Sequence, residues 1–280
     1  METNSNSEAM DVIIPTWNSS DILDMVLEGV REHIHPNRII LVDRNSTDKT
    51  LDIAKEFDCD VLTDTVSLGS ARMLGISSSS AEFVAFIDDD IVIHEDFREK
   101  LMEFMDNETG AVQGTALSTE PRLRRRMKDR WEKLTKEKGF FLLKPGQRGY
   151  TNCTILRRRL LSGLQIEDLN SFEDWVIANH ILEEGYSWKI TPVYVDHHHV
   201  VKSVVSKYGW NGAGIWNLAK TGRLSISKTL RYFTRYAATH PLDMVVDLRL
   251  DDRENFIYHF KALVGVMLSP LYTVKKFLRD

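Results

Sequence analysis

The first hundred residues alternate between short apolar runs and longer segments with apolar residues at helical spacing. Aliphatic and aromatic residues fill "DVIIPTW", "RIILVD" and "EFVAFID", and "DVLTD" is a shorter run of this kind. Between them, "NSSDILDMVLEGVREH", "NSTDKTLDIAKEF" and "GSARMLGISSSS" read as helices, the first two with polar cap candidates. Strands that are apolar on both faces and alternate with helices predict an α/β fold with a mostly parallel, doubly wound sheet. We expect the first strand to stop at Pro15.

Polar residues follow three of the four predicted strands. Pro15–Asn18 close the first strand, Asp43 ends the second, and Asp88–Asp90 end the fourth. Because ligands of open α/β sheets bind beyond the carboxyl ends of the strands, we expect these residues to line one site. The sequence has neither the Gly-rich dinucleotide fingerprint nor a P-loop lysine, so NAD and Walker-type phosphate binding are not supported.

The three adjacent carboxylates of Asp88, Asp89 and Asp90 repel one another unless water or a cation compensates them. An acidic solvated turn is one interpretation. A divalent cation is the other, because Mg²⁺ and Mn²⁺ prefer carboxylate oxygens and bridge to phosphates. Asp88 and Asp90 point to the same side of an extended chain and are the natural pair of ligands.

Composition narrows the class of protein. The chain has 280 residues, of which 42% are hydrophobic and 28% charged, as in an ordinary globular protein. Cys59 and Cys153 are too few for a disulfide framework or a thiolate zinc site, which favours a reducing, cytoplasmic setting. The polar start "METNSNSEAM" does not resemble a secretory signal, and no uncharged apolar run is long enough to predict a membrane span.

Charge is distributed unevenly along the chain. Residues 1–100 contain 8 Lys and Arg against 21 Asp and Glu, whereas the remaining residues carry a net charge of +8. The basic remainder favours an anionic partner such as nucleotide phosphates or a phospholipid surface. We do not expect a nucleic-acid partner, because the acidic part would repel the phosphate backbone.

Four motifs together resemble a known family. "VIIPTWN", "LVDRNSTDKT", "GSARMLGI" and "FVAFIDDDIVI" are similar, in order and spacing, to the donor-binding half of family-2 glycosyltransferases with the GT-A fold. The resemblance is strong over residues 10–95 and weaker to about residue 200. It implies an inverting, metal-dependent transfer of a sugar from a UDP- or GDP-sugar to an acceptor hydroxyl or phosphate. The acceptor would be a glycan or a lipid-linked carrier such as a polyprenyl phosphate.

Two rival interpretations remain beside this resemblance. One is a non-catalytic nucleotide-sugar-binding scaffold with the GT-A fold. The other is a phosphatase of the haloacid dehalogenase type, whose signature resembles "FIDDDIV". That signature normally lies on the first strand, whereas here the aspartates close the fourth, so the phosphatase is disfavoured.

The resemblance also implies roles for individual residues. Asp90 would contact an Mg²⁺ or Mn²⁺ ion most directly, and Asp88 would face the ribose or the waters of the metal. Asp43 would contact the nucleobase. The family pattern usually has another aromatic residue at position 17 and a small or acidic residue at position 44, where this chain has Trp17 and Arg44. The resemblance therefore does not decide whether the base is uracil or guanine. The other residues assigned to the nucleotide sugar are Pro15, Thr16, Asn18, Arg72 and Asp89.

The segment "NSFEDWVIANHILEEGY" resembles the part of the family that supplies the catalytic base. Asp174 is the favoured base and Glu173 the second candidate, because a carboxylate can take the proton of an attacking hydroxyl. The spacing of Ser171 and Asp174 also fits a capping box that opens a helix ending before Gly185.

Three adjacent histidines in "VYVDHHHVV" are candidates for a further ligand of the metal, in addition to the aspartates. An extended chain sends His197 and His199 to one face, and in several related enzymes a histidine from this region completes the metal site. We expect His199 or His197 in this role; one sequence does not decide among His197, His198 and His199. A polar strand end that binds nothing is the alternative.

The rest of the chain is less informative. Asn152, in "RGYTNCTILRRRL", is expected near the acceptor sugar by resemblance. The basic, apolar C-terminal part is expected either to lie on the inner face of an anionic membrane as a peripheral protein or to pack as helices or a dimer contact. The predicted organisation is a disordered segment 1–10, a nucleotide-sugar-binding half 11–115, an acceptor half 116–205 and a helical extension 206–280.

Overall fold

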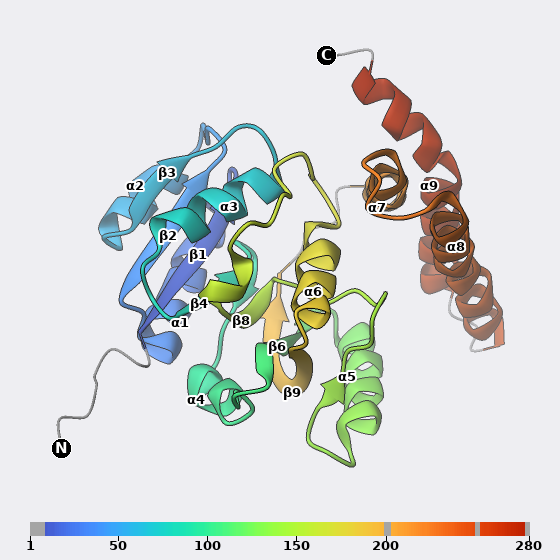
Figure 1. Cartoon of the computed structure of the whole chain (residues 1–280). Coiled ribbons are helices and arrows are strands. Elements are labelled where there is room, and N and C mark those ends of the chain that lie inside the picture. Colours follow the sequence, from blue (N-terminus) through green and yellow to red (C-terminus); the bar gives the residue numbers. More distant parts are fainter. Residues whose placement is uncertain (1–8, 199–202, 250–252, 278–280) are drawn as a thin grey trace. The chain divides into compact units, whose positions relative to one another are not determined.

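The structure, a computed structural model, describes residues 9–198, 203–249 and 253–277 (Figure 1). These residues form two compact units. The first contains residues 9–168 and 173–198, and the second contains residues 169–172 and the described residues from 203 onward. All strands of the described part lie in the first unit, and the second unit is helical.

Four parallel strands form one half of the sheet in the first unit. Their order is β3-β2-β1-β4, and each lies parallel to its neighbour. The strands are β1 (Met10–Thr16), β2 (Arg38–Asp43), β3 (Asp60–Thr63) and β4 (Phe83–Ile87). They coincide with the four apolar runs of the sequence.

The other half of the sheet is mixed. Strand β8 (Cys153–Arg157) is antiparallel to β4 and to β6 (Thr109–Ser118), and β6 is parallel to β9 (Ser187–His197). The two-residue strands β5 (Ile91–Val92) and β7 (Phe141–Leu142) both pair antiparallel with β9. The pairing of β5 brings the carboxyl end of β9 to the turn that follows β4.

Helices cover both faces of the parallel half (Figure 1). The Ser67 side chain caps helix α3 by accepting a hydrogen bond from the Ser70 N–H, as a serine N-cap does. Glu120 caps α5 in the same way, and Pro121 occupies its first turn. The helices of this unit are α1 (Leu23–Ile34), α2 (Thr50–Glu56), α3 (Leu68–Ser78), α4 (Phe97–Met102), α5 (Pro121–Thr135), the 3₁₀ turn η1 (Arg158–Leu161) and α6 (Glu173–Glu183).

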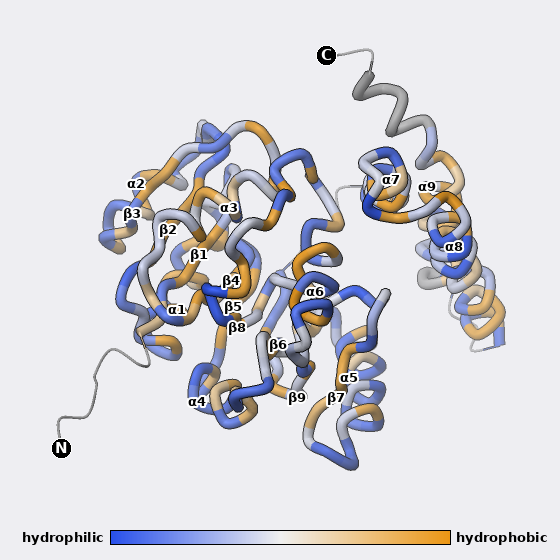
Figure 2. Tube along the Cα trace, viewed as in Figure 1, coloured by the Kyte–Doolittle hydropathy of each residue, from blue (hydrophilic) through white to orange (hydrophobic). Residues whose placement is uncertain are grey.

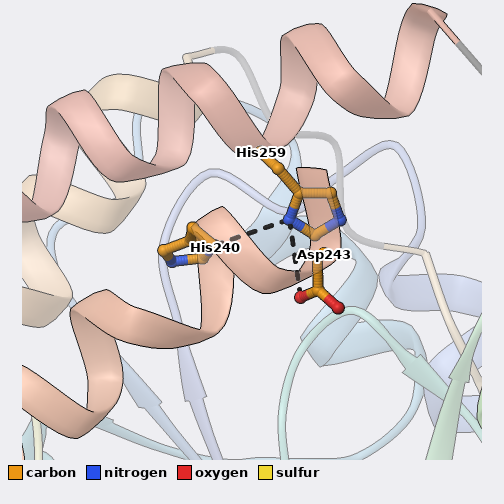
Figure 3. A group of neighbouring side chains, drawn as sticks. All are labelled: His240, Asp243 and His259. Atoms are coloured by element: carbon orange, nitrogen blue, oxygen red, sulfur yellow. Dashed lines mark hydrogen bonds and ion pairs between the residues drawn. The ribbon is translucent and has the colours of Figure 1, made fainter. Parts of the chain in front are cut away.

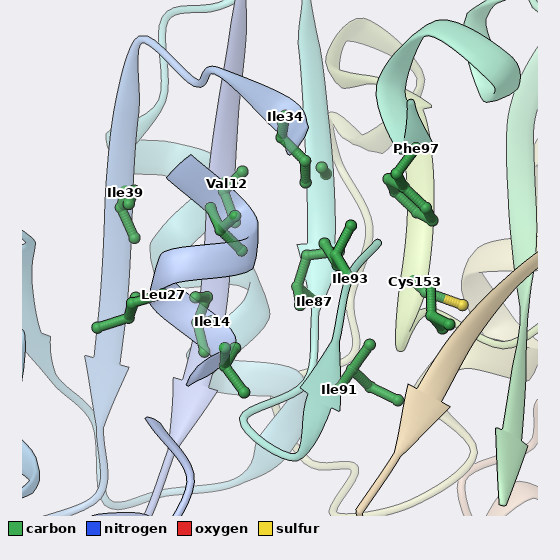
Figure 4. Close-up of a cluster of buried hydrophobic side chains, with 14 of the residues drawn as sticks. Val12, Ile14, Leu27, Ile34, Ile39, Ile87, Ile91, Ile93, Phe97 and Cys153 are labelled. Carbon is green, nitrogen blue, oxygen red and sulfur yellow. The ribbon is translucent and has the colours of Figure 1, made fainter. Parts of the chain in front are cut away.

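The core explains why the strands are apolar on both faces. Val12 and Ile14 point to the side of α1, where they pack in a cluster with Leu27 (Figure 4). Ile13 points to the opposite face, where a Cβ at Gly75 of α3 would lie 2.4 Å from its side chain. Successive residues of a strand therefore bury against different helices, and the hydropathy trace shows the central strands as largely apolar (Figure 2). The predicted α/β fold, with a parallel half of the sheet covered on both faces by helices, is confirmed.

The first strand runs past Pro15, so the prediction that it stops there was wrong. Strand β1 continues to Thr16, and Pro15 is in register with Val42 of β2. On its other side β1 pairs with β4 only as far as Ile13. Pro15 thus lies where one edge of the strand has no ladder to interrupt, a position that tolerates a residue without an N–H.

The second unit contains three helices among its described residues: α7 (Val204–Lys220), α8 (Ile226–Arg249) and α9 (Arg253–Phe277). Helices α7 and α9 approach closely at Gly265 of α9, where an added Cβ would lie only 2.3 Å from the Val205 carbonyl oxygen of α7. Only glycine fits at such a contact. In the described part of the chain, no helix has both the length and the apolar character needed to cross a membrane.

Candidate functional site

The turn between β4 and β5 holds the three aspartates at the carboxyl edge of the parallel strands. The Ile91 N–H donates to the Asp88 carbonyl oxygen at 3.1 Å and closes the turn. The Asp88 N–H donates to the Asn152 carbonyl oxygen, also at 3.1 Å, which fixes the turn against the residue before β8. Residues 88–90 therefore form a turn instead of the extended chain that the sequence predicted, and their three side chains contact different partners.

Asp88 is paired with a buried arginine. The Arg72 side chain on α3 is only 2% exposed, and its Nη2 lies 2.9 Å from Asp88 Oδ1. Its Nε lies 3.4 Å from Glu173 Oε1, and its guanidinium stacks over the Phe86 ring at 4.9 Å. Burial alone would lower the pKa of Arg72, but the carboxylates of Asp88 and Glu173 outweigh it and raise that pKa. Arg72 therefore stays charged at the centre of the site.

Glu173 lies at the start of α6 in a buried environment. Burial and the neighbouring Asp174 carboxylate raise the pKa of Glu173 to about 7, although Arg72 and Arg148 act in the opposite direction. In the part of the chain that the structure describes, Arg72 Nη1 and Glu173 Oε2 are buried without a hydrogen-bond partner. Such orphaned polar atoms are uncommon in protein interiors, and strongly perturbed pKa values cluster at functional sites.

Asp89 faces the loop that follows β1. Its Oδ2 accepts a hydrogen bond from the Trp17 N–H at 3.2 Å and another from the Ser19 hydroxyl. Burial raises the pKa of Asp89 to about 7, and the adjacent carboxylates of Asp88 and Asp90 add to this effect. The middle aspartate thus holds the loop after β1 against the acidic turn.

Asp90 meets the end of β9. His197 Nε2 lies 3.2 Å from Asp90 Oδ2, and the His198 N–H donates to the Asp90 carbonyl oxygen at 2.8 Å. The pairing of Ile91 with His197 produces this contact. His199, the first choice from the sequence, lies outside the described residues. A carboxylate of the acidic turn and an imidazole of β9, distant in sequence, are therefore in contact.

The loops after β1 and β2 form the rim of the site. Thr16 is the last residue of β1, and Pro15 precedes it inside the strand. The Trp17 side chain is 60% exposed, and the Arg44 guanidinium lies 5.9 Å from the centre of its ring. An exposed aromatic ring beside a cation offers a flat surface for another planar group.

Asp43 and Asn18 tie these two loops together. The Asp43 carboxylate is buried and accepts hydrogen bonds from the N–H and the hydroxyl of Ser46. Asn18, with a positive φ of 51°, accepts from the Thr47 N–H at 2.8 Å and donates its own N–H to the Ser46 hydroxyl. Asp43 thus fixes the conformation of the loop after β2, and Asn18 holds the loop after β1 against it.

Asp174 is paired with Arg148, for which the sequence predicted no role. Arg148 Nε lies 2.8 Å from Oδ1 and 2.9 Å from Oδ2 of Asp174, and Oδ1 also accepts the Trp175 N–H at 2.7 Å. The carboxylates of Asp174 and Glu173 raise the pKa of Arg148 despite burial, which acts to lower it, and the guanidinium stacks over Tyr150. Its only signal in the sequence was its place as the first of four arginines in the segment 148–160.

The predicted capping box at Ser171 and Asp174 was wrong. In a capping box the acidic residue is the third residue of the helix. Helix α6 begins at Glu173, so Asp174 is only its second residue. Phe172, directly before the helix, has a φ of 67° instead of the extended backbone of an N-cap. This left-handed residue turns the chain sharply into α6. The helix ends before Gly185, as predicted.

The side chains of the acidic turn and of His197 are of the chemical kind that binds a divalent cation. Asp90 Oδ2 and His197 Nε2 lie 3.2 Å apart, and Asp88 is two residues from Asp90 in the same turn. Carboxylate oxygens with an imidazole nitrogen suit Mn²⁺ well, and Mg²⁺ through the oxygens. Asn152 contributes its backbone carbonyl to the turn, and its side-chain Oδ1 lies 3.6 Å from Cys153 Sγ. The parallel edge of the sheet thus brings together an acidic turn, an exposed aromatic rim and two buried arginine–carboxylate pairs.

Comparisons with known proteins agree with this arrangement. Residues 11–163, more than half of the chain, match the model of glycosyl transferase family 2. EpsH of Bacillus subtilis (strain 168), which is named as a glycosyltransferase, is 25% identical over 224 residues. That alignment covers 71% of this chain but 63% of EpsH, so the chain spans less than two thirds of that relative.

Two solved structures share the fold. The mannosyltransferase PcManGT from Pyrobaculum calidifontis, in complex with GDP-Man and Mn²⁺, aligns with a TM-score of 0.66 at 16% identity, covering 93% of this chain and 86% of that one. A TarS fragment from S. aureus in complex with UDP aligns with a TM-score of 0.53 at 15% identity, covering 95% and 92%. At 15–16% identity, the two structures show that the fold is shared and nothing more. Family membership is shown by the sequence match over residues 11–163. The chain belongs to glycosyl transferase family 2.

Proposed function

We propose that this protein transfers a sugar from a nucleoside-diphosphate sugar to an acceptor, with inversion at the anomeric carbon and with a divalent cation. The observation that carries this proposal is the contact of Asp90 with His197, 3.2 Å apart, in the acidic turn that also contains Asp88 and follows strand β4. Family membership and the ligands of the two structural neighbours, GDP-Man with Mn²⁺ and UDP, support it.

The donor nucleotide would lie along the rim formed by the first two loops. The exposed Trp17 ring and Arg44 offer a stacking surface for a base or ribose, and the loop shaped by Asp43 lies beside them. Asn18 keeps the two loops in one position. Pre-formed loops of this kind reduce the ordering cost of binding a nucleotide.

Asp88, Asp90 and His197 would hold the cation, as Mn²⁺ or Mg²⁺. When bound, the cation would neutralise the negative charge of the departing diphosphate. Arg72 has a different role, because it keeps Asp88 oriented through Oδ1 and places a fixed positive charge behind the acidic turn. Asp89 holds the donor loop through Trp17 and Ser19.

Asp174 is the proposed general base. Arg148 orients its carboxylate, and among the described residues Oδ2 accepts a hydrogen bond only from Arg148. A second lone pair of that oxygen therefore remains for the proton of an acceptor hydroxyl. Glu173 is the second candidate, but Arg72 binds it at the buried start of α6. With the base acting on the acceptor and no protein nucleophile in the reaction, a single displacement inverts the anomeric centre.

The acceptor is the part of the reaction that the chain defines least. Asn152, beside the acidic turn, and Tyr150, which stacks under Arg148, are proposed to face it. The exposed apolar side chains of Leu242 and Leu248 on α8, which are 68% and 65% exposed, support a peripheral contact with a membrane that carries a lipid-linked acceptor.

A nucleotide-binding experiment tests the proposal first. Calorimetric titration with UDP, GDP and their common sugar conjugates, with and without Mn²⁺, should show metal-dependent binding of one nucleotide class. Incubation of the bound donor with glycan and polyprenyl-phosphate acceptors should then release the nucleoside diphosphate.

The two steps separate the alternatives. Binding without any transfer, over a broad acceptor panel, would favour a non-catalytic nucleotide-sugar scaffold. Absence of binding by a folded protein, with every nucleotide and with either metal, would reject the donor site at the acidic turn.

A further inference from the structure

A second group of metal-binding side chains lies in the helical unit. His240 and Asp243 are one turn apart on α8, and His259 faces them from α9 (Figure 3). One ligand atom from each of the three residues lies within 4.8 Å of the other two. The residues come from two helices that meet within one compact unit, so the group does not depend on how the two units are placed.

Two of the three distances between these atoms are close to those around a bound metal ion. His240 Nδ1 lies 3.5 Å from His259 Nδ1, and His259 Nδ1 lies 3.8 Å from Asp243 Oδ2 (Figure 3). In a tetrahedral zinc site with bonds of about 2.0 Å, neighbouring ligand atoms are about 3.3 Å apart. Small side-chain rotations would therefore complete a site with two nitrogen ligands and one oxygen ligand.

A buried carboxylate lies behind the second histidine. Asp247 is one turn further along α8 and only 1% exposed, and its Oδ2 lies 3.8 Å from His259 Nε2. This distance is longer than a hydrogen bond. If a small rotation let Asp247 accept the Nε2–H of His259, the other ring nitrogen would be left as a lone-pair donor. This outer partner would direct Nδ1 of His259 toward His240 and Asp243. It is an observation independent of the three ligands.

Aromatic rings enclose the group and hold both imidazoles. The Tyr208 ring of α7 packs edge-on against His240 at 4.8 Å, and the Tyr258 ring packs against His259 at 5.4 Å. The two tyrosine hydroxyls lie 3.2 Å apart. The His240 side chain is buried, and within the described part of the chain its Nε2 has no hydrogen-bond partner. The two imidazoles are therefore enclosed by aromatic rings, whereas the Asp243 side chain, 40% exposed, lies at the open side of the group.

We propose that His240, Asp243 and His259 bind a first-row divalent transition metal, with Zn²⁺ the preferred ion and Asp247 the outer partner of His259. Two imidazoles and a carboxylate suit Zn²⁺, whereas Mg²⁺ prefers oxygen ligands alone. The two carboxylates of Asp243 and Asp247 balance the charge of the ion. The bound ion would join α8 to α9 near Pro241, which interrupts the backbone hydrogen bonds of α8. This site is separate from the donor site and does not depend on the proposed transferase function.

Zinc titration of the full chain tests the proposal. Calorimetry is performed with Zn²⁺ in an excess of Mg²⁺, which occupies oxygen-rich sites, after removal of bound metals by a chelator. The wild-type protein and the control His33→Gln, on α1 of the first unit, should bind one tight zinc ion. His240→Gln and His259→Gln should lose that ion, and Asp247→Asn should bind it about 10–100-fold more weakly.

A second measurement keeps the test independent of folding defects. Asp243→Asn changes only the charge of a partly exposed side chain, and its circular dichroism should match the wild type while tight zinc binding is lost. Co²⁺ bound to the wild type should give the intense visible absorption of a four-coordinate site, absent in His259→Gln. Equal zinc affinity in the wild type, His259→Gln and Asp243→Asn would overturn the proposal. So would loss of the tight zinc ion in Asp90→Asn alone, because the ion would then belong to the first unit.

Discussion

The guanidinium of Arg72 joins the acidic turn after β4 to the first residue of α6. Its Nη2 lies 2.9 Å from Asp88 Oδ1, and its Nε lies 3.4 Å from Glu173 Oε1. This one buried side chain connects a proposed metal ligand with the residue next to the proposed base. Removing it would leave two carboxylates without their shared counter-charge.

We therefore expect Arg72→Met to lower the free energy of unfolding by about 3 kcal/mol or more, because breaking a buried ion pair leaves an uncompensated charge. Urea unfolding measures this. The matched control is Arg38→Met, whose pair with Asp60 at 2.7 Å is about half exposed. It should cost about 1 kcal/mol or less. Similar losses in both variants would contradict the structural role of Arg72.

Asp90→Asn should abolish the metal-dependent part of nucleotide binding, because an amide oxygen is a weaker ligand for a hard cation than a carboxylate. Calorimetry with UDP and GDP, with and without Mn²⁺, measures this part as a difference. Asp96→Asn, at an exposed position just before α4, serves as control and should behave as the wild type. Metal-dependent binding that survives in Asp90→Asn would exclude Asp90 as a ligand.

Asp174→Asn should leave donor binding intact and slow transfer by about 10²–10⁴-fold, the usual contribution of a general base. Product formation under saturating donor measures the rate, and nucleotide titration measures binding. Glu184→Gln, an exposed residue just after α6, should keep the wild-type rate. A near wild-type rate in Asp174→Asn would place the base elsewhere, and Glu173→Gln would then be tested in the same assay.

Glu173 predicts how stability depends on pH. Burial and the Asp174 carboxylate raise the pKa of Glu173 from 4.5 to about 7, so the folded state holds this proton more tightly than the unfolded state. The contribution of Glu173 to stability is therefore full below pH 4.5 and is lost as the pH rises toward about 7. Urea unfolding at several pH values should show this decline, and Glu173→Gln should weaken it. A slope that is unchanged in Glu173→Gln would assign the decline to other groups.

The apolar surface of α8 predicts membrane binding. Replacement of both Leu242 and Leu248 by serine should reduce co-flotation with vesicles that contain anionic phospholipid, because less apolar area can enter the interface. Val66→Ser removes a comparably exposed apolar side chain, 65% exposed, in the first unit and should have no effect. If the double variant floats as well as the wild type, this surface of α8 does not mediate lipid contact.

Local patterns in the sequence were sufficient to predict the parallel half of the fold. A strand that is apolar at every position, such as β1, must be covered on both faces, and the alternation with helices then implies a parallel sheet. Because parallel strands end at one edge, the positions of Thr16, Asp43 and Asp88 near the site followed as well. These inferences depend only on neighbouring residues and on the geometry of strands.

The partner of each side chain was decided by the tertiary structure. Asp88, Asp89 and Asp90 are adjacent in sequence, yet they meet Arg72, Ser19 and His197, which come from different elements. No local pattern distinguishes these partners, because the contacts arise from strand order and helix packing over long separations. The pairing of Arg148 with Asp174 and the left-handed turn before α6 escaped prediction for the same reason.

In the helical unit, too, the sequence determined part of the proposed metal site and the tertiary structure decided the rest. The spacing of His240, Asp243 and Asp247 already places them on one side of a helix, since residues three, four and seven apart share a face. This spacing alone does not predict a metal site, because a further ligand from another helix is needed. The packing of α9 against α8 brings His259 to them, and this contact between distant residues is a property of the folded chain alone.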